Sequence, residues 1–219
     1  MHEPVIIINF KTYPSSIGEK ALKLAKICEK IAYEANADIR IAVSATDIYP
    51  VSKAVDIPVY AEHVDPYLLD RHTGSVLPEA VKTAGAAGTL LNHSEHQLSM
   101  KEIAQSVGIA SRLSLTTVVC ADTPEKAEEI ARFKPDFIAV EPPELIGGDI
   151  SVSRAEPEII TRSVDLVKKK HRVKLLVGAG VKTKADVVKA LELGADGVLI
   201  ASGIDQAKNP EKALKDLLP

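Results

Sequence analysis

A histidine and a glutamate each follow a short apolar run of the chain. His93 comes just after Gly88–Leu91, and Glu141 comes just after Phe137–Val140, 48 residues further on (141 − 93). In a parallel α/β sheet the carboxyl ends of all strands face one side, where such folds keep their chemistry. A glutamate that leads into the pair Gly147-Gly148 is typical of a base beside a movable lid. We therefore expect this histidine and this glutamate to decide what the chain does.

Short β-branched runs alternate with longer amphipathic segments from one end of the chain to the other. The expected strands are Val5–Phe10, Ile39–Val43, Val59–Ala61, Gly88–Leu91, Ser114–Val119, Phe137–Val140, Val173–Val177 and Gly197–Ile200. The expected helices include Gly18–Glu34, Lys101–Ser111, Pro124–Arg132, Glu156–Lys170, Lys184–Leu193 and Pro210–Leu218. The strand runs are apolar on both faces, as in a parallel sheet covered by helices. In addition, Thr123 and Asn209 each precede a proline and are expected to cap a helix.

This alternation predicts an α/β fold built as one (β/α)₈ barrel, a single domain spanning residues 1–219. Eight strands in 219 residues leave about 27 residues per βα unit, close to the least that a full barrel uses. An open doubly wound sheet is the alternative. No low-complexity tract or long linker interrupts the series.

Composition narrows the classes of function. Hydrophobic residues make up 46% of the chain and are interspersed with charge, which predicts no membrane span, and no basic region precedes the first apolar run as in a secretory signal. A net charge of −3 argues against broad nucleic-acid binding. The two cysteines, Cys28 and Cys120, are interpreted as buried small hydrophobes in a reducing compartment. We expect a soluble cytoplasmic protein.

Two loops of small residues follow the seventh and eighth expected strands. They are Gly178-Ala179-Gly180 and Ala201-Ser202-Gly203. Barrels of this class often bind phosphate at these two loops, because small side chains let a dianion approach backbone N–H groups. The remaining residues expected at the same end of the barrel are Asn9 to Lys11, Ser44, Glu62-His63, Asn92 to Glu95, Cys120 and Glu141.

Five blocks of the sequence closely resemble the triosephosphate isomerase family in its short archaeal form. The blocks are Asn9–Tyr13, Thr73-Gly74, Asn92–Glu95, Val140–Gly147 and Ala201–Gly203, and they fall in the family's order at the matching strand ends. The resemblance spans nearly the whole chain. It implies a TIM barrel that interconverts dihydroxyacetone phosphate and D-glyceraldehyde 3-phosphate through a cis-enediolate, a step of glycolysis and gluconeogenesis, without metal or organic cofactor.

The resemblance also implies a role for each catalytic residue. Glu141 would move a proton between C1 and C2 of the triose, and His93 would be the neutral electrophile that donates a hydrogen bond to the carbonyl oxygen. The neutrality of His93 would make sense if the following segment began a helix whose dipole lowers the imidazole pKa. Lys11 would supply a fixed positive charge and Asn9 a side-chain amide. Glu95 would be a supporting carboxylate that pairs with Lys11 or positions His93.

Substrate binding and assembly follow from the same resemblance. The expected substrate-binding residues are Asn9, Phe10, Lys11, Ile146, Gly147, Gly180, Ala201 and Ser202. The phosphate would be held through backbone N–H groups. The Thr73-Gly74 loop would reach into a neighbouring subunit, which predicts a homo-oligomer, with a tetramer favoured over a dimer.

Four positions depart from the family's usual pattern. The lid reads Gly147-Gly148-Asp149 where the family commonly has Gly-Thr-Gly, so Asp149 would bring a negative charge near a bound dianion. His96 stands where arginine is usual, and Glu62 stands where glutamine is usual. The last two are expected near subunit contacts, so they put the interface in more doubt than the chemistry.

Other interpretations remain open from the sequence. His93 and His96, with His63 nearby, could suggest a metal site, although nothing marks a further supported ligand. Another phosphate-binding barrel, such as an isomerase or lyase of amino-acid biosynthesis, would share the last two loops but would not need His93 and Glu141 in this arrangement. A non-catalytic barrel that binds sugar phosphates is the alternative from a different class.

Overall fold

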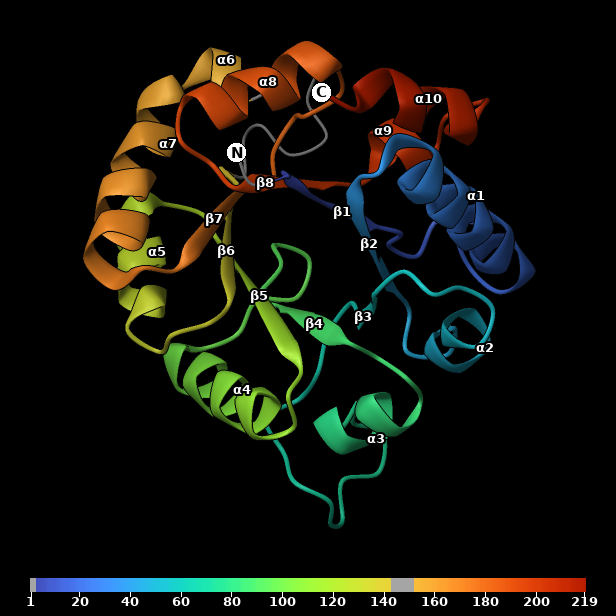
Figure 1. The fold of residues 1–219 in the computed structure, drawn as a ribbon. Coiled ribbons are helices and arrows are strands. Elements are labelled where there is room, and N and C mark those ends of the chain that lie inside the picture. Colours follow the sequence, from blue (N-terminus) through green and yellow to red (C-terminus); the bar gives the residue numbers. More distant parts are fainter. Residues whose placement is uncertain (1–2, 143–151) are drawn as a thin grey trace.

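The chain folds into a closed barrel of parallel strands surrounded by helices (Figure 1). The computed structural model describes residues 3–142 and 152–219. The strands follow one another around the barrel in sequence order, and β8 pairs with β1 to close it. They are β1 (Val5–Asn9), β2 (Asp38–Val43), β3 (Val59–Ala61), β4 (Gly88–Leu91), β5 (Thr116–Ala121), β6 (Phe137–Val140), β7 (Lys174–Val177) and β8 (Gly197–Ile200). The predicted (β/α)₈ TIM barrel is confirmed, and the open doubly wound sheet is excluded.

The closure between β1 and β8 depends on a glycine. Val5 pairs with Gly197 at the start of both strands. A Cβ atom on Gly197 would lie 1.9 Å from the carbonyl oxygen of Val5, far inside van der Waals contact. The backbones can approach this closely only because glycine has no side chain.

One strand begins later than the sequence suggested. The predicted run Ser114–Val119 is observed as Thr116–Ala121. Ser114 has a left-handed backbone with φ of 53° and belongs to the return from the preceding helix. It therefore cannot join the extended ladder, and the strand runs two residues further than expected, through Cys120 to Ala121.

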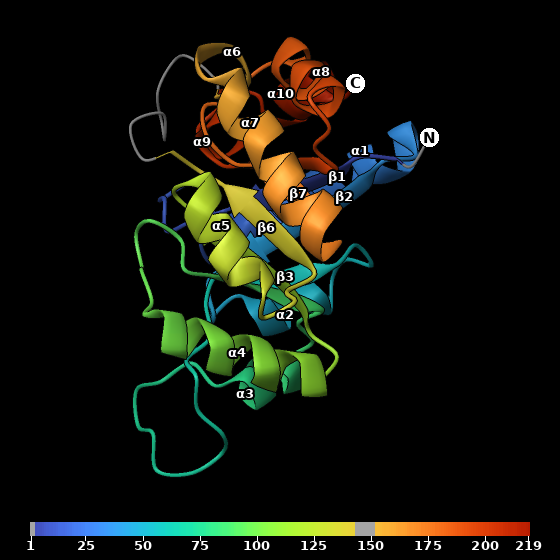
Figure 2. The ribbon, with the colours of Figure 1, turned by 90° about the vertical axis from the view of Figure 1, so that its left-hand side faces the viewer.

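The helices cover the outside of the barrel (Figures 1 and 2). They are α1 (Glu19–Ala35), α2 (Ile48–Ser52), α3 (Pro78–Thr83), α4 (Met100–Arg112), α5 (Pro124–Ala131), α6 (Val152–Ala155), α7 (Pro157–Ser163), α8 (Lys184–Glu192), α9 (Ser202–Asp205) and α10 (Pro210–Leu217). The sequence missed the four short helices α2, α3, α6 and α9. The predicted helix Glu156–Lys170 is wrong in detail, because α7 passes into a π-helical segment over Val164–Lys169.

Capping side chains fix where several helices begin. The side chain of Thr123 accepts the N–H of Lys126 at the start of α5, and that of Asn209 accepts the N–H of Lys212 at the start of α10. Both predicted caps are confirmed. Each satisfies a backbone donor that the first turn of a helix leaves unpaired.

Apolar side chains form two packed layers. Alternate residues of each strand point into the barrel or out toward the helices, so that Ile7 joins the inner cluster and Ile6 the outer one. Cys120 is buried inside the barrel and Cys28 is buried on α1, as predicted. The barrel is therefore a filled core, and chemistry is confined to its ends.

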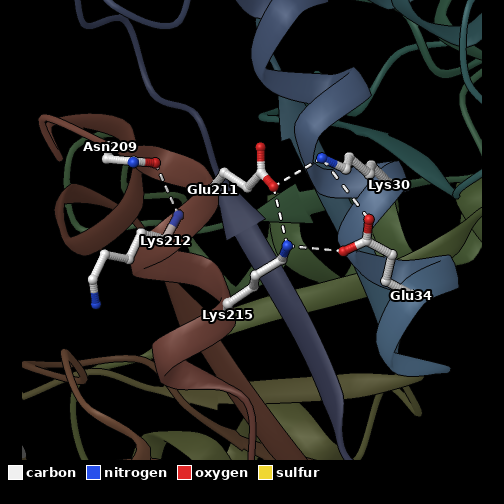
Figure 3. Close-up of polar contacts among 6 residues, drawn as sticks. All are labelled: Lys30, Glu34, Asn209, Glu211, Lys212 and Lys215. Carbon is white, nitrogen blue, oxygen red and sulfur yellow. Dashed lines mark hydrogen bonds and ion pairs between the residues drawn. The ribbon is translucent and has the colours of Figure 1, made fainter.

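The last helix is joined to the first by exposed ion pairs (Figure 3). Glu211 of α10 lies 2.9 Å from the Nζ of Lys30 on α1, and Lys215 lies 2.9 Å from a carboxylate oxygen of Glu34 on α1. Glu211 and Lys215 also pair with each other at 3.0 Å. Exposed pairs contribute little one by one, and linked pairs contribute more. They complete the ring of helices where the two ends of the chain meet.

A long loop between β3 and α3 projects away from the barrel (teal in Figure 2). Asp65 and Val76 close its base: the N–H of Asp65 donates to the Val76 carbonyl, and the N–H of Val76 donates to an Asp65 carboxylate oxygen. Gly74 in this loop has φ of 94°. Within residues 3–142 and 152–219, no helix is both long and apolar enough to cross a membrane.

Candidate active site

A hollow lies at the mouth of the barrel, at the carboxyl ends of the strands, with about 540 Å³ of empty space that is partly open to solvent. Its walls come from the loops after β1, β4, β6, β7 and β8. The lining residues are Asn9, Lys11, Tyr13, His93, Glu141, Gly178, Gly180, Val181, Lys182, Leu199, Ile200, Ala201, Ser202 and Gly203. Thus all four predicted catalytic residues line one hollow, although they come from three different strand ends.

Some predicted substrate-binding residues lie elsewhere. Gly180, Ala201 and Ser202 line the hollow as expected. Phe10 is fully buried behind it and packs in the outer core. Ile146 and Gly147 lie outside the described residues, as do Gly148 and Asp149 of the lid.

Asn9 and Lys11 are held in place by the turn that ends β1. The Asn9 side-chain oxygen accepts the backbone N–H of Lys11 at 3.1 Å. Lys11 has a left-handed backbone with φ of 49°, a strained conformation that is common at functional sites. Its Nζ lies 2.9 Å from Oε1 of Glu95. The turn therefore directs the ammonium group into the mouth, where the Glu95 carboxylate steadies it.

Glu141 is a buried carboxylate directly after β6. Its backbone N–H donates to the Ala121 carbonyl at 2.8 Å, which extends the pairing of β6 with β5. Burial raises the pKa of Glu141 to about 7, while the Cys120 thiol and Lys11 act in the opposite direction. Its Oε2 atom has no hydrogen-bond partner among the described residues. A desolvated carboxylate with a pKa near neutrality is suited to act as a general base.

Space for the Glu141 side chain comes from the loop after β7. A Cβ atom on Gly178 would lie 2.4 Å from Cγ and 2.7 Å from Oε1 of Glu141. The backbone N–H of Gly178 donates to the Val140 carbonyl at 3.0 Å, so the two loops are locked together. The sequence indicated Gly178 only as part of a phosphate loop. Its contact with Glu141 depends on strand pairing and could not be read from the chain.

His93 is 8% exposed, and its ring is oriented by its own loop. The backbone N–H of Glu95 donates to Nδ1 of His93 at 3.2 Å. A neutral imidazole that accepts at Nδ1 carries its hydrogen on Nε2. Burial, followed by Lys11, lowers the pKa of His93, while the Glu95 carboxylate raises it.

The balance of these effects favours the neutral ring. The Glu95 carboxylate lies 3.6 Å from Nδ1 and would attract an imidazolium, but this side chain is 63% exposed and screened by water. Burial and Lys11 outweigh it. His93 is therefore a neutral hydrogen-bond donor through Nε2 near neutral pH.

The condition under which a helix dipole would explain a neutral His93 is not met. The segment forms a turn in which the N–H of His96 donates to the His93 carbonyl at 2.8 Å. The next helix, α4, begins only at Met100, where Ser99 and Glu102 form a capping box. A helix dipole at His93 is thus not the reason for its lowered pKa. Burial and the charge of Lys11 lower this pKa instead.

Asn92 holds the loop that carries His93. It has a left-handed φ of 56°. Its amide nitrogen donates to the Cys120 carbonyl, and its amide oxygen accepts the N–H of Leu98, both at 2.8 Å. These bonds fix the loop after β4 against β5, so the position of His93 is set before any ligand binds.

The two small-residue loops face the hollow next to Lys182. Gly180 has a left-handed φ of 68°, and Ser202 begins the short helix α9. Lys182 follows the first loop and lines the same hollow. Its backbone N–H is fixed by the Asp186 carboxylate at 3.2 Å. Sequence reasoning missed Lys182, although its place directly after Gly178–Val181 was a usable signal.

Two of the three histidines considered for a metal site pack against each other through their rings. The rings of His63 and His96 stack at 4.0 Å, and Nε2 of His63 lies 3.3 Å from Asp65. Burial lowers the pKa of His63. Within residues 3–142 and 152–219, no group of three or more histidine, cysteine or acidic residues is placed to hold a metal ion.

Comparison with known proteins gives one family. The sequence profile of triosephosphate isomerase matches residues 4–217. The triosephosphate isomerase of Saccharolobus solfataricus is 49% identical over 218 residues, covering 100% of this chain and 96% of the relative. Those of Methanothermobacter thermautotrophicus and Methanobacterium bryantii are 49% and 48% identical over 216 residues, covering 98% of this chain and 94% and 96% of the relatives. The chain therefore belongs to the triosephosphate isomerase family.

Proposed function

We propose that the mouth of the barrel converts dihydroxyacetone phosphate and D-glyceraldehyde 3-phosphate into one another, with Glu141 as base and His93 as electrophile. The reaction follows from family membership: the chain is an isomerase of glycolysis and gluconeogenesis. The roles of its residues are our proposal. The observation that carries them is the meeting of a desolvated Glu141 and a neutral His93 in one hollow beside Lys11. We propose no metal or organic cofactor for these steps.

Glu141 takes a proton from one carbon of the triose and returns it to the next. Its carboxylate is buried, and its Oε2 has no hydrogen-bond partner among the described residues. Water therefore does not stabilise the ionised form, and the carboxylate is a stronger base than a solvated one. Gly178 lets the carboxylate lie against the loop after β7, between the triose and the phosphate loops.

His93 and Lys11 stabilise the charge that develops on oxygen. The Nε2–H of His93 is free to donate to the carbonyl oxygen, because Nδ1 already accepts from the Glu95 backbone. A neutral donor with this fixed orientation stabilises an enediolate without reorganisation during the reaction. Lys11 adds a fixed positive charge, and Asn9 adds a side-chain amide at the same wall. Glu95 supports both through its ion pair and its backbone N–H.

The phosphate lies against the loops after β7 and β8. Gly180, Ala201 and Ser202 present backbone to the hollow with small or no side chains, which suits a dianion held by N–H groups. We assign Ile146 and Gly147 to the same group from the family resemblance. Lys182 is a second cation on this wall, and we propose that it attracts the phosphate.

We propose that the chain works as a homo-oligomer, with a tetramer favoured over a dimer and the Thr73-Gly74 loop at an interface. The loop between β3 and α3 projects from the barrel (Figure 2), and Tyr67, Leu68 and Leu69 expose large apolar surface on it. Its neck is closed by the Asp65 and Val76 bonds, so the loop has a defined shape. Sedimentation at micromolar concentration tests this, and a monomer would contradict it. We place the chain in the cytoplasm, with triose phosphate as its partner and neither nucleic acid nor membrane.

A coupled assay of triose phosphate isomerisation tests the assignment of the base. Glu141→Asp retracts the carboxylate by one methylene, so kcat should fall on the order of 10²-fold while KM changes little. Glu129→Gln, an exposed carboxylate on α5, is the control and should leave both constants unchanged. Full turnover in the Glu141→Asp variant would remove Glu141 from the role of base.

A further inference from the structure

A buried carboxylate outside the proposed chemistry lies beneath the phosphate loop. Asp205 is the last residue of α9, the short helix that begins at Ser202, and it is 2% exposed. Neither of its side-chain oxygens has a hydrogen-bond partner among the described residues. An ionised carboxylate in such a place would be very costly, because neither water nor a donor stabilises it.

Glu62 is a second, half-buried carboxylate near Asp205. It follows β3, where the family usually has glutamine, and its Oε1 is buried without a partner within residues 3–142 and 152–219. Glu62 and Asp205 lie close enough for their charges to interact. The proximity of Glu62 and Asp205 could not be predicted from the sequence, because β3 and α9 are far apart in the chain.

The charge of Lys11 acts on both carboxylates, but its ammonium group already forms an ion pair with a third one. Its charge acts on Glu62 and on Asp205, but its Nζ lies 2.9 Å from Glu95. It also acts on Glu141. Were Glu62, Asp205, Glu95 and Glu141 all ionised, two lysines, Lys11 and Lys182, would face four negative charges. A phosphate dianion would then be repelled from the mouth rather than attracted.

Lys182, whose side chain lies beside Gly203 of α9, is a further cation near the pair, but the charged groups around the pair do not balance four carboxylates. The charge of Asp205 acts on Cys28 of α1, whose thiol is deeply buried and stays protonated, since burial and Asp205 both raise its pKa. Asp47 before α2 and Glu95 after β4 both act on Glu62 as further negative charges. α10 also packs against α9. The charged side chains of α10 pair with each other or with α1 at the surface, as Figure 3 shows for part of them.

We propose that Glu62 and Asp205 are held as neutral acids when substrate binds, and that they thereby keep the charge of Lys11 available to the phosphate dianion. They are positioning residues that act through Lys11, so the inference rests on the proposed role of Lys11. Burial is the largest cause that raises both pKa values, that of Glu62 to about 7 and that of Asp205 to about 8. These values place the loss of their protons at and just above neutral pH.

A specific pH dependence of substrate affinity follows. As the pH rises from 7 to 9, both acids ionise, the mouth becomes more negative, and the KM for D-glyceraldehyde 3-phosphate rises. An added charge near a dianion in a site of intermediate dielectric changes affinity by about tenfold. The value of kcat should change much less, because Glu141 and His93 keep their own contacts.

The experiment compares wild type with Glu62→Gln, Asp205→Asn and the double variant, each nearly isosteric and uncharged. The KM of wild type should rise about tenfold between pH 7 and pH 9. The double variant should rise less than about threefold, and each single variant should fall between. Glu129→Gln should follow wild type. A double variant whose KM rises as steeply as that of wild type would overturn the proposal.

Two further measurements separate this inference from the proposed role of Lys11. The infrared difference between wild type and Asp205→Asn at pH 6 should contain the carbonyl stretch of one buried protonated acid, and this component should fade in wild type as the pH rises above 8. Its absence at pH 6 would overturn the proposal, and if the variant failed to fold, wild-type spectra in which no such component fades above pH 8 would do the same. Lys11→Gln tests the other point: unchanged KM there refutes the role of Lys11, whereas impaired binding with a wild-type pH profile in the double variant refutes the carboxylate pair alone.

Discussion

The Glu141 side chain occupies the space where any residue larger than glycine at position 178 would place its Cβ atom. That atom would lie 2.4 Å from Cγ and 2.7 Å from Oε1 of Glu141. Glu141 follows β6, whereas Gly178 follows β7 and leads into a phosphate loop. One contact between a side chain and a backbone therefore constrains both the proposed base and the loop proposed to hold the phosphate.

Gly178→Ala should displace the base without removing it. The methyl group would push the carboxylate out of its place, and a shift of about 1 Å at a reacting group can cost on the order of 10²-fold in rate. We expect kcat to fall by this factor while the chain stays folded, as measured by the coupled assay and circular dichroism. Gly108→Ala on α4 is the matched control, since a Cβ there meets nothing within 4 Å. Equal activity of the two alanine variants would contradict the contact.

The architecture was predictable because it follows from strong local patterns. The runs Val59–Ala61, Gly88–Leu91, Phe137–Val140 and Gly197–Ile200 match the observed strands to the residue. Short helices such as α2 and α3 were not predicted, because four to six residues show too little hydrophobic periodicity to be recognised. The start of β5 was not predicted, because it depends on the left-handed backbone of one residue, Ser114. The π-helical segment after α7 is likewise set by packing rather than by pattern.

His93 should be found with its hydrogen on Nε2 over a wide pH range. Because Nδ1 accepts from the Glu95 backbone, substitution of the Glu95 side chain should leave the tautomer unchanged. Glu95→Gln should lower the pKa of His93 further, since the carboxylate is the group that raises it. Nitrogen-15 NMR of the ring nitrogens measures both. A hydrogen found on Nδ1 of the neutral ring would refute the proposed donor.

The acid limb of the rate profile should report Glu141. Its pKa is about 7 and only the ionised form is a base, so kcat/KM should fall as the pH drops through this value. The Cys120 thiol acts to lower that pKa. Cys120→Ala should therefore move the limb to higher pH and reduce activity at pH 7.

A second buried cysteine provides the control for this variant. Cys28→Ala makes the same small cavity on α1, outside the inner cluster that contains Cys120. It should cost about 1 kcal/mol of unfolding free energy, as small core deletions do, and leave the acid limb in place. If the acid limb of the kcat/KM profile moves equally in both variants, the cause is a general loosening of the core rather than the loss of the Cys120 thiol.

The site was predictable where chemistry sits next to a strand end, and not where it depends on a distant approach. Asn9, Lys11, His93 and Glu141 share the mouth because strand ends in a parallel barrel must. The orientation of the His93 ring was not predicted, since it depends on a turn that brings the Glu95 backbone back to Nδ1. Asp205 was missed because its importance comes from its burial at the end of α9 and from the charge of Glu62. Neither of these two causes is a local property of the chain.

Lys182 should strengthen phosphate binding without taking part in proton transfer. It lines the hollow beside Gly180 and Ser202, and the Asp186 carboxylate fixes its backbone. A partly exposed charge pair contributes about 0.5–1 kcal/mol, which corresponds to a two- to fivefold change in affinity. Lys182→Gln should therefore raise KM and the inhibition constant of inorganic phosphate by this factor and leave kcat nearly unchanged.

Lys184→Gln separates a specific contact from the general field. Lys184 begins α8 two residues later, is exposed, and does not line the hollow. The Lys184→Gln variant removes the same charge from the same region of the surface. Because Lys184 does not line the hollow, the KM of this variant and its inhibition constant for inorganic phosphate should stay near those of wild type. An equal rise in both variants would show that long-range attraction alone is at work, and it would be suppressed by added salt. A rise confined to Lys182→Gln is the result that the position of Lys182 on the wall predicts, because Lys182 lines the hollow and Lys184 does not.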